Sequence, residues 1–330
     1  MLTTQQIQSF VDHNYIVLED CFSAETAQEW VENACQQSGI DLTDACTWPQ
    51  PHCFLGQHMT ERKELALSQF SPKLWTAVCQ LVGGEERIQP PLTVNDAFVV
   101  NFSLGSDQPW AEPIKRQGGW HVDGDFNQFI DSPEAGLFIL MLFTDVQPHG
   151  GATYIAPDSI AHILGHFLHH PQGLSAYHLR TSHNVAQQCN VGTPALGKAG
   201  TVYLMYPQML HTTSQNLLRK PRFIRNGQVR LKSPMRFDRS RSIWQASGNA
   251  YLLKILDSVF GAIFIMADRD KARRSRDVAL DLQYHRDLID LVLSGKTEQA
   301  SKEMDRHLTR SLQNSLNTFQ VPKPPTDLDK

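Results

Sequence analysis

Residues 119–126 have the sequence Gly-Trp-His-Val-Asp-Gly-Asp-Phe, in which one residue separates a histidine from an aspartate. On a β-strand, residues i and i+2 project from the same face, so His121 and Asp123 can offer an imidazole nitrogen and a carboxylate oxygen to one ion. Asp125 would lie on that face too. Taken alone, the motif is better explained as a histidine and an aspartate that hydrogen-bond to each other at a strand end than as a metal site. The rest of the sequence has to decide between these two interpretations.

The region around this motif, about residues 90–235, has the texture of an all-β domain. Short runs rich in β-branched and aromatic residues, separated by glycine and proline turns, occupy residues 97–102, 137–143, 152–155 and 201–206. Many short strands with such turns favour a sandwich or barrel over a βαβ sheet. One helical insert is predicted at 159–170, where apolar residues recur at helical spacing.

Helical segments flank this region on both sides. A helix, a short strand at 15–18 and a second helix are predicted over residues 3–37. Apolar residues recur at helical spacing again in 250–267, in 277–293 and after 297. We therefore predict a mainly β body with N-terminal helices over 1–238, a helical unit over 239–320, and a flexible polar tail over 321–330.

The composition is that of an ordinary soluble protein, with 41% hydrophobic and 19% charged residues. A formal charge of −4 offers no general attraction to nucleic acid. The longest apolar run, 259–267, is far shorter than the roughly 20 residues of a membrane span, and the amino terminus lacks a signal pattern. We therefore expect a cytoplasmic protein with no membrane partner, whose six scattered cysteines are reduced.

His211 is the candidate for a third metal ligand, because it closes a predicted strand over 200–210. Two histidines and one carboxylate on one face of an octahedron leave three positions open, as in non-haem iron(II) oxygenases. Arg222 follows shortly after. Its planar guanidinium matches a carboxylate bidentately, which suits the distal carboxylate of 2-oxoglutarate.

These motifs together resemble the phytanoyl-CoA dioxygenase family over about residues 2–238. The resemblance is carried by His121-Val122-Asp123, residues 150–159, Gly200-Thr201 leading to His211, Asn216, Pro221-Arg222, and the opening segments 2–7 and 14–18. It implies a double-stranded β-helix (jelly-roll, cupin-like) core. In that fold His121, Asp123 and His211 would be the metal ligands and catalytic residues, and Arg222, Thr213 and Asn101 would bind the co-substrate.

The resemblance also implies an activity. It indicates a dioxygenase that uses Fe(II), 2-oxoglutarate and O2 to hydroxylate a small organic molecule, with release of succinate and CO2. Halogenating relatives carry a small residue at the carboxylate position, so Asp123 argues for hydroxylation. The sequence departs from the family at 157–159, where relatives commonly have Pro-Gly-Ser-His.

The tail is similar to the later helices of the ligand-binding domain of GntR-type regulators, over about residues 239–320. The matching segments are 243–253, 285–289, 294–296 and 306–308. Metal-binding members of that group use an aspartate and a histidine four residues apart, and two later histidines. His285 and His307 fit the later pair, but Arg236 and Ser240 occupy the earlier positions. We therefore predict a packing role for these helices, including contact between two copies in a homodimer.

Several alternatives stay open at this point. The body can be a catalytically altered β-helix protein that acts as a ligand-binding or regulatory module through its helical tail, or a cupin-like isomerase or hydrolase without 2-oxoglutarate. Trp120, Phe126 and Phe129 suit a substrate pocket and a packed core equally. For the histidine row 162, 166 and 170, and for the basic run 269–276, a solvated surface is the favoured interpretation over zinc and phosphate binding.

Overall fold

The computed structural model describes residues 1–115, 119–129, 131–170, 172–175 and 183–233, together with Asp287, Gln299, Lys302, Glu303 and Arg306. The chain divides into two compact units, Met1–Ile243 and Trp244–Lys330. Nearly all the described residues belong to the first unit, which we call the body. The predicted boundary after residue 238, the tail helices with His285 and His307, the basic run 269–276 and the homodimer contact lie outside the described residues.

The N-terminal prediction of helix, strand and helix is confirmed. Helix α1 (Thr4–His13) begins with a capping box, in which the Thr3 hydroxyl accepts from the Gln6 backbone and the Gln6 side chain accepts from the Thr3 backbone. Strand β1 (Tyr15–Leu18) follows, and the Ser23 hydroxyl caps α2 (Ala24–Ser38). These local signals set the element boundaries before any tertiary contact is considered.

A six-stranded antiparallel sheet, the major sheet, forms the centre of the body. Its order is β1-β9-β6-β11-β5-β2. The strands other than β1 are β2 (His52–Phe54), β5 (Val99–Asn101), β6 (Leu137–Leu142), β9 (Val202–Met205) and β11 (Arg222–Val229). A second antiparallel sheet, the minor sheet, has the order β10-β7-β8 and consists of β7 (Thr153–Ala156), β8 (Thr193–Pro194) and β10 (Leu210–Thr213).

Alternation along the strands of the major sheet creates two hydrophobic cores. Even-numbered residues of β6, such as Phe138, Leu140 and Leu142, pack with Ile155 of β7 and Leu210 of β10 to form the inner core between the sheets. Odd-numbered residues of the same strand pack on the other face against the N-terminal helices. Two antiparallel sheets facing each other across the inner core make the predicted double-stranded β-helix.

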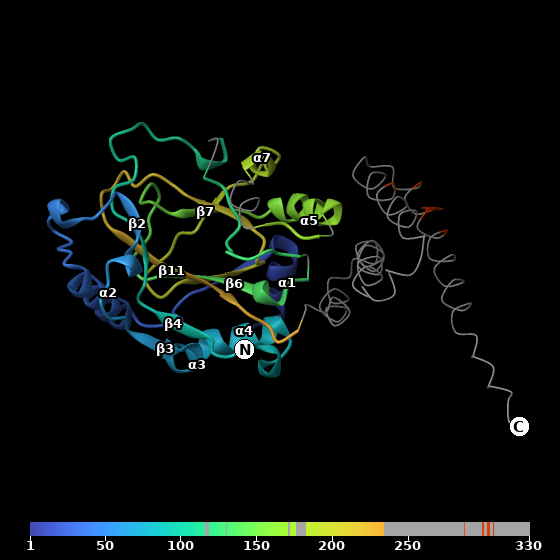
Figure 1. Cartoon of the computed structure of the whole chain (residues 1–330), viewed down its shortest axis with the longest axis horizontal. Coiled ribbons are helices and arrows are strands. Elements are labelled where there is room, and N and C mark those ends of the chain that lie inside the picture. The colour runs from blue at the N-terminus through green and yellow to red at the C-terminus, as the bar shows by residue number, and fades with distance from the viewer. Residues whose placement is uncertain are drawn as a thin grey trace, which may run out of the picture. The chain divides into compact units, whose positions relative to one another are not determined.

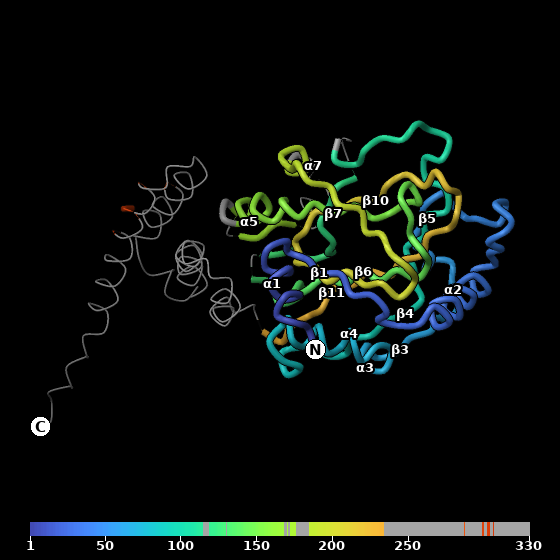
Figure 2. The backbone as a smooth tube through the Cα atoms, turned by 180° about the vertical axis from the view of Figure 1, so that it is seen from behind, coloured from blue at the N-terminus to red at the C-terminus, as the bar shows by residue number. Residues whose placement is uncertain are grey.

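The outer face of the major sheet is covered by α2, α3 (Leu67–Phe70), α4 (Pro72–Val82) and a hairpin of β3 (Glu64–Ala66) and β4 (Thr93–Asn95). Figures 1 and 2 show α3 and α4 on one side of this sheet, and β7, α5 (Ser159–His169) and α7 (His183–Ala186) on the other. The predicted insert helix at 159–170 is thus confirmed. No helix among the described residues combines the length and the hydropathy that a bilayer crossing requires.

Two sequence predictions about the strands are wrong. Residues 200–211 do not form one strand: a turn at Pro207, closed by the Met209 amide donating to the Tyr206 carbonyl, separates β9 in the major sheet from β10 in the minor sheet. His121-Val122-Asp123 is not a strand either, since only His121 forms a bridge and the motif lies between two glycines of positive φ. The site is therefore built at a crossing between sheets and not along one strand.

Candidate metal centre

His121 and His211 are brought together by an antiparallel bridge. The His121 amide donates to the His211 carbonyl, the His211 amide donates to the His121 carbonyl, and both distances are 3.0 Å. Residues paired in this way present their side chains on the same face, and the two ring centroids lie 4.4 Å apart. Backbone pairing thus places two imidazoles side by side from segments far apart in the chain.

Asp123 completes the cluster. Its Oδ1 lies 3.4 Å from His121 Nε2 and 3.6 Å from His211 Nε2, and one ligand atom from each residue falls within 4.8 Å of the others. Asp125, the competing carboxylate, is exposed and outside this group. In the described part of the chain this is the one group of three or more histidine, cysteine or acidic residues with metal-binding geometry. The histidine row on α5 does not form a second group.

Hydrogen bonds fix which ring nitrogens face the centre of the cluster. His121 Nδ1 lies 2.8 Å from the Gly119 carbonyl, and His211 Nδ1 lies 3.1 Å from the Met209 carbonyl. A carbonyl only accepts, so each Nδ1 carries the proton and each Nε2 offers a lone pair to an ion. His211 Nε2 is buried and has no hydrogen-bond partner among the described residues. Such an orphaned nitrogen fits a metal ligand.

Residues of the neighbouring elements orient the Asp123 carboxylate. The Asn226 side-chain amide on β11 donates to Asp123 Oδ2 at 2.6 Å, which leaves Oδ1 for the cluster. The Gln128 and Gln228 amides donate to the Asp123 backbone carbonyl at 2.9 and 2.8 Å. Burial opposes ionisation of Asp123, but in the metal-free protein the protonated forms of His211 and His121, which can donate from Nε2, outweigh it and hold the pKa of the carboxyl below its usual range. The carboxylate is thus ionised and held in place.

Arg222 is the second unusual feature of the site. Its side chain is 1% exposed, and its Nε donates to the Gly151 carbonyl at 2.8 Å. Neither of its two terminal nitrogens has a hydrogen-bond partner among the described residues. Burial lowers the pKa of Arg222 to about 9, so the guanidinium is still charged at neutral pH. A buried cation with two unsatisfied donors is unfavourable unless an anion completes it.

Gly151 is required where Arg222 meets it. Its φ is +76°, and an added Cβ would lie 2.6 Å from Asn101 Nδ2 and 3.0 Å from Asn216 Cβ. Only glycine allows the backbone carbonyl to approach the arginine here. The Gly150-Gly151 pair seen in the sequence therefore shapes the surroundings of Arg222.

The two candidate helpers of Arg222 lie close to it, together with a residue that no sequence pattern had indicated. Arg222, Asn101 and His52 are register partners across β11, β5 and β2, so they form one row on the inner face of the major sheet. Thr213 shares a strand face with His211 on β10, and its hydroxyl lies 3.5 Å from His52 Nε2. The Asn101 amide donates to the Ser214 carbonyl and accepts from the Leu104 amide, which leaves it one hydrogen for another acceptor.

His52 is neutral in these surroundings. Burial, followed by the charges of Arg222 and His121, lowers the pKa of His52 to about 4. No periodic pattern or motif marked residue 52, because its position depends on which strands pair. A neutral imidazole beside the Thr213 hydroxyl can take part in a hydrogen-bond network. Because it carries no charge, it does not compete with Arg222 for an anion.

The predicted aromatic residues divide between core and surface. Trp120 is 1% exposed, belongs to the inner core and donates its indole hydrogen to the Pro113 carbonyl at 3.1 Å. Phe126 and Phe129 are half-buried. The Phe138 ring on β6 packs 5.1 Å from the His211 ring and forms an apolar wall of the cluster. All six cysteines are free thiols, as expected.

Comparison with known proteins gives a partial match for each region. A family model described as the FCD domain matches residues 223–310, which confirms the resemblance of the tail to the GntR-type ligand-binding domain. The match begins within β11, so it also includes residues that belong to the major sheet of the body. No curated protein matches the chain.

Three of the solved structures that this chain resembles are described as follows. A non-haem alpha-ketoglutarate-dependent carbocyclase, SnoK from nogalamycin biosynthesis, is 15% identical with a TM-score of 0.40, over 70% of this chain and 84% of that one. EctD from S. alaskensis with bound Fe is 20% identical with a TM-score of 0.40, over 71% and 80%. A Pseudomonas putida prolyl-4-hydroxylase is 10% identical with a TM-score of 0.36, over 69% and 97%.

Identities and TM-scores this low carry no argument about chemistry, so the function of this chain has to be inferred from its own residues. The resemblance to the phytanoyl-CoA dioxygenase family stays a prediction, since none of these findings names that family. The roles of the individual site residues stay predictions as well.

Proposed function

We propose that this chain is an Fe(II)- and 2-oxoglutarate-dependent dioxygenase that hydroxylates a small organic molecule and releases succinate and CO2. The observation that carries the proposal is Arg222, a buried guanidinium with two unsatisfied nitrogens, in the same inter-sheet site as a His-Asp-His cluster. A metal cluster alone fits many enzymes. A cluster next to a site for a carboxylate fits a co-substrate that binds the metal and carries a second, distant carboxylate.

Each residue has a role that follows from its contacts. His121 Nε2, His211 Nε2 and Asp123 Oδ1 would hold iron(II) from one side. The Arg222 terminal nitrogens would bind the distal carboxylate of 2-oxoglutarate bidentately, and the Thr213 hydroxyl would donate to the same group. Phe138 and the surrounding inner core limit access of water to the ring of His211.

When iron(II), 2-oxoglutarate and O2 are bound, such a site supplies oxidative decarboxylation, which places one oxygen atom in succinate and the other in a C–H bond of the substrate. The chain's own contribution is positioning. Asn226 holds one oxygen of Asp123, the carbonyls of Gly119 and Met209 hold the two imidazole tautomers, and the Gly151 carbonyl holds Arg222. Because these contacts are made in advance, binding requires little rearrangement of the site.

Anaerobic calorimetric titration of 2-oxoglutarate into the iron(II)-loaded protein tests the proposal. Wild type should bind one molecule per chain. Arg222→Leu should weaken binding by roughly 100-fold or more, since two charge-assisted hydrogen bonds are lost. Arg222→Lys should fall between the two because lysine retains the charge without the planar fork. Failure of the iron-loaded wild type to bind 2-oxoglutarate would sink the proposal.

A second candidate function is favoured by the FCD match, namely a ligand-binding or regulatory module whose β-helix has lost activity. In that case nothing would maintain an unpaired buried arginine beside three metal-ligand atoms. Metal analysis of the purified protein separates the candidates, because a regulatory module with an altered body would fold normally without binding iron. An isomerase or hydrolase would bind metal, but its affinity for 2-oxoglutarate would be the same in wild type and in Arg222→Leu.

A further inference from the structure

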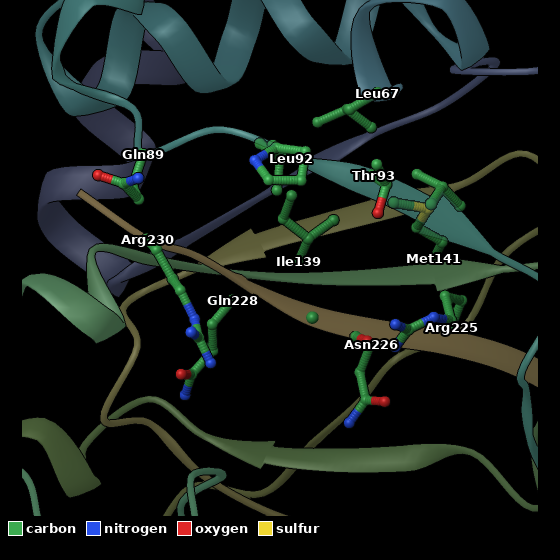
Figure 3. A pocket seen from close by; sticks show the side chains of 13 residues that line it. Leu67, Gln89, Leu92, Thr93, Ile139, Met141, Arg225, Asn226, Gln228 and Arg230 are labelled. Atoms are coloured by element: carbon green, nitrogen blue, oxygen red, sulfur yellow. Dashed lines mark hydrogen bonds between the residues drawn. The ribbon is translucent and has the colours of Figure 1, made fainter. Parts of the chain in front are cut away.

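A cavity of about 330 Å3 lies on the outer face of the major sheet, behind the strand that carries Arg222. Its floor is formed by β11 and β6, where Gly227 pairs with Ile139 and Arg225 pairs with Met141. Leu67, Leu92 and residues of β4 form the opposite wall (Figure 3). Arg225 and Gly227 are odd-numbered, outward-facing positions of β11. Asn226 and Gln228 also border the cavity, but their side chains point the other way (Figure 3), so the cavity lies on the outer side of the sheet.

Gly227 creates this space. It lies in the middle of β11, in regular antiparallel register and without a positive φ, so the backbone does not require glycine there. A Cβ added at this position would meet no atom within 4 Å. Glycine inside a strand weakens it, and it often marks a place where a ligand approaches closely. The absent side chain is what keeps the cavity open.

The lining is apolar in the middle and carries a cation at one end. Leu67, Leu92 and Ile139 lie between Arg225 at one end and Gln89 at the other, whereas the Arg230 side chain points away from them, in the direction of Gln228 (Figure 3). This distribution suits an amphiphilic molecule, because a hydrocarbon body can lie over Gly227 while a charged group meets an arginine. A cavity of this size is at the lower end of the range of about 300–1,000 Å3 for small-molecule sites.

Arg225 is the better placed of the two arginines for an anion. Its Nε donates to Asn95 Oδ1 at 3.0 Å, and one terminal nitrogen contacts the Asn226 carbonyl. Both acceptors are uncharged, and the ion pairs found among the described residues do not include Arg225. Burial lowers the pKa of Arg225 and the nearby Arg62 lowers it further, while the negative charges of Glu64 and Asp123 act in the opposite direction. The guanidinium is thus oriented by neutral partners and has no carboxylate in direct ion-pair contact among the described residues.

We infer that this cavity is a second ligand site, and that it takes a small organic carboxylate with a hydrocarbon body. The carboxylate binds Arg225 and the hydrocarbon lies over Gly227 against Leu67, Leu92 and Ile139. The cavity needs neither iron nor 2-oxoglutarate to form, because Arg222 and Arg225 leave β11 on opposite faces. It shares that strand with the metal site, since Asn226, which holds Asp123, lies between Arg225 and Gly227.

Binding of octanoate to the full-length, metal-free protein tests the inference, with the neutral amide octanamide as the second probe. Wild type should bind octanoate by calorimetry, and octanamide at least about tenfold more weakly, because only the acid pairs with a guanidinium. Gly227→Leu should fill the cavity and weaken octanoate binding by about tenfold or more. Arg225→Met should do the same by removing the charge while keeping a similar chain length.

Two further variants distinguish binding in this cavity from binding elsewhere on the protein. Gly165→Leu, on α5, is the matched control, since a Cβ there also meets nothing within 4 Å, and it should bind octanoate like wild type. Arg222→Leu should bind octanoate normally, which excludes capture of the probe by the co-substrate site. The inference is overturned if wild type does not bind octanoate, if octanamide binds equally well, or if Gly227→Leu and Arg225→Met, both shown by circular dichroism to be folded, bind octanoate like wild type.

Discussion

Two arginines of strand β11, Arg222 and Arg225, leave it on opposite faces and meet opposite surroundings. Arg222 points into the site between the sheets, is 1% exposed and has two terminal nitrogens without partners in the described structure. Arg225 points to the outer cavity and is held by oxygen atoms of Asn95 and Asn226. Burial lowers the pKa of both. The first depends on a ligand to complete its hydrogen bonds, whereas the second is already oriented by the protein.

One strand can thus serve two sites. Because side chains alternate between faces, Arg222, Asn226 and Gln228 face the metal cluster, while Arg225 and Gly227 face the cavity. The two sets share one backbone. A substitution on β11 is therefore expected to change iron binding mainly when the substituted residue contacts Asp123. Variants in matched pairs, one from each face, test this division.

The largest effect on iron affinity is expected from the three metal-ligand residues themselves. Asp123→Ala removes one of three ligands, so iron affinity should fall by more than the roughly 10–100-fold that is typical when only a hydrogen-bonding partner of a ligand is lost. Turnover, measured as succinate formation, should disappear. Asp125→Ala is the control, since this carboxylate is exposed and two residues away. Equal iron affinity in the two variants would show that Asp123 is not a ligand.

Asn226 should give the next largest effect, because its amide fixes Asp123 Oδ2 at 2.6 Å. Asn226→Ala leaves all three ligands in place but frees the carboxylate to rotate, so iron affinity should fall by about 10–100-fold. Asn95→Ala is the counterpart on the outer face, where it removes an acceptor of Arg225. It should leave iron affinity unchanged. A similar loss in both variants would mean that the strand transmits any disturbance, and the proposed division between faces would be wrong.

The sequence predicted the parts of this site that depend on motifs and local signals. His121, Asp123 and His211 come together as expected, and Arg222 lies near them with Thr213 and Asn101. The capping residues Thr3 and Ser23 set the first two helices, and the strand textures marked β5, β6, β7 and β9. In each case the information is contained in a few neighbouring residues or in a resemblance to a known pattern.

What the sequence missed depends on pairing between distant segments. His52 joins the row of Arg222 only because β2 pairs with β5, and a three-residue strand has no periodicity to recognise. Asn226 and Gln228 are polar residues on the core-facing side of β11, and their purpose is visible only when Asp123 is seen beside them. The break at Pro207 is not marked by a change of texture, because Tyr206 precedes it and Met209 and Leu210 resume the apolar run after one polar residue. The cavity beside Gly227 could not be predicted from the sequence, because it depends on which residues of other segments surround this glycine.

The two arginines should have opposite effects on stability. Arg222→Leu replaces an unpaired buried cation by an apolar side chain, so the free energy of unfolding should rise by about 1–3 kcal/mol. Arg225→Leu removes two hydrogen bonds to neutral oxygens, so it should fall by about 1–2 kcal/mol. Urea unfolding of the metal-free proteins, followed by circular dichroism, measures both. A loss of stability in Arg222→Leu would indicate a structural arginine and would weaken the case for a co-substrate anchor.

The smallest effect concerns His52, whose pKa is lowered to about 4 by burial and by the charges of Arg222 and His121. The unfolded chain has an ordinary histidine pKa near 6.5, so between these values the unfolded state binds more protons than the folded state. The stability contributed by neutral His52 is therefore complete above about pH 6.5 and is lost as the pH falls toward 4. His52→Gln should show a smaller decrease in unfolding free energy between pH 7 and 5 than wild type.

His58→Gln, at an exposed position nearby, is the control for this pH profile and should follow wild type. Arg222→Leu offers a second check, because removing its charge should raise the pKa of His52, which can be followed by NMR titration of the imidazole. Arg225→Leu, on the outer face, should leave that titration unchanged. If both arginine variants shift the pKa of His52 equally, the two faces of β11 are not electrostatically separate. Arg222 and Arg225 would then differ only in their hydrogen bonds.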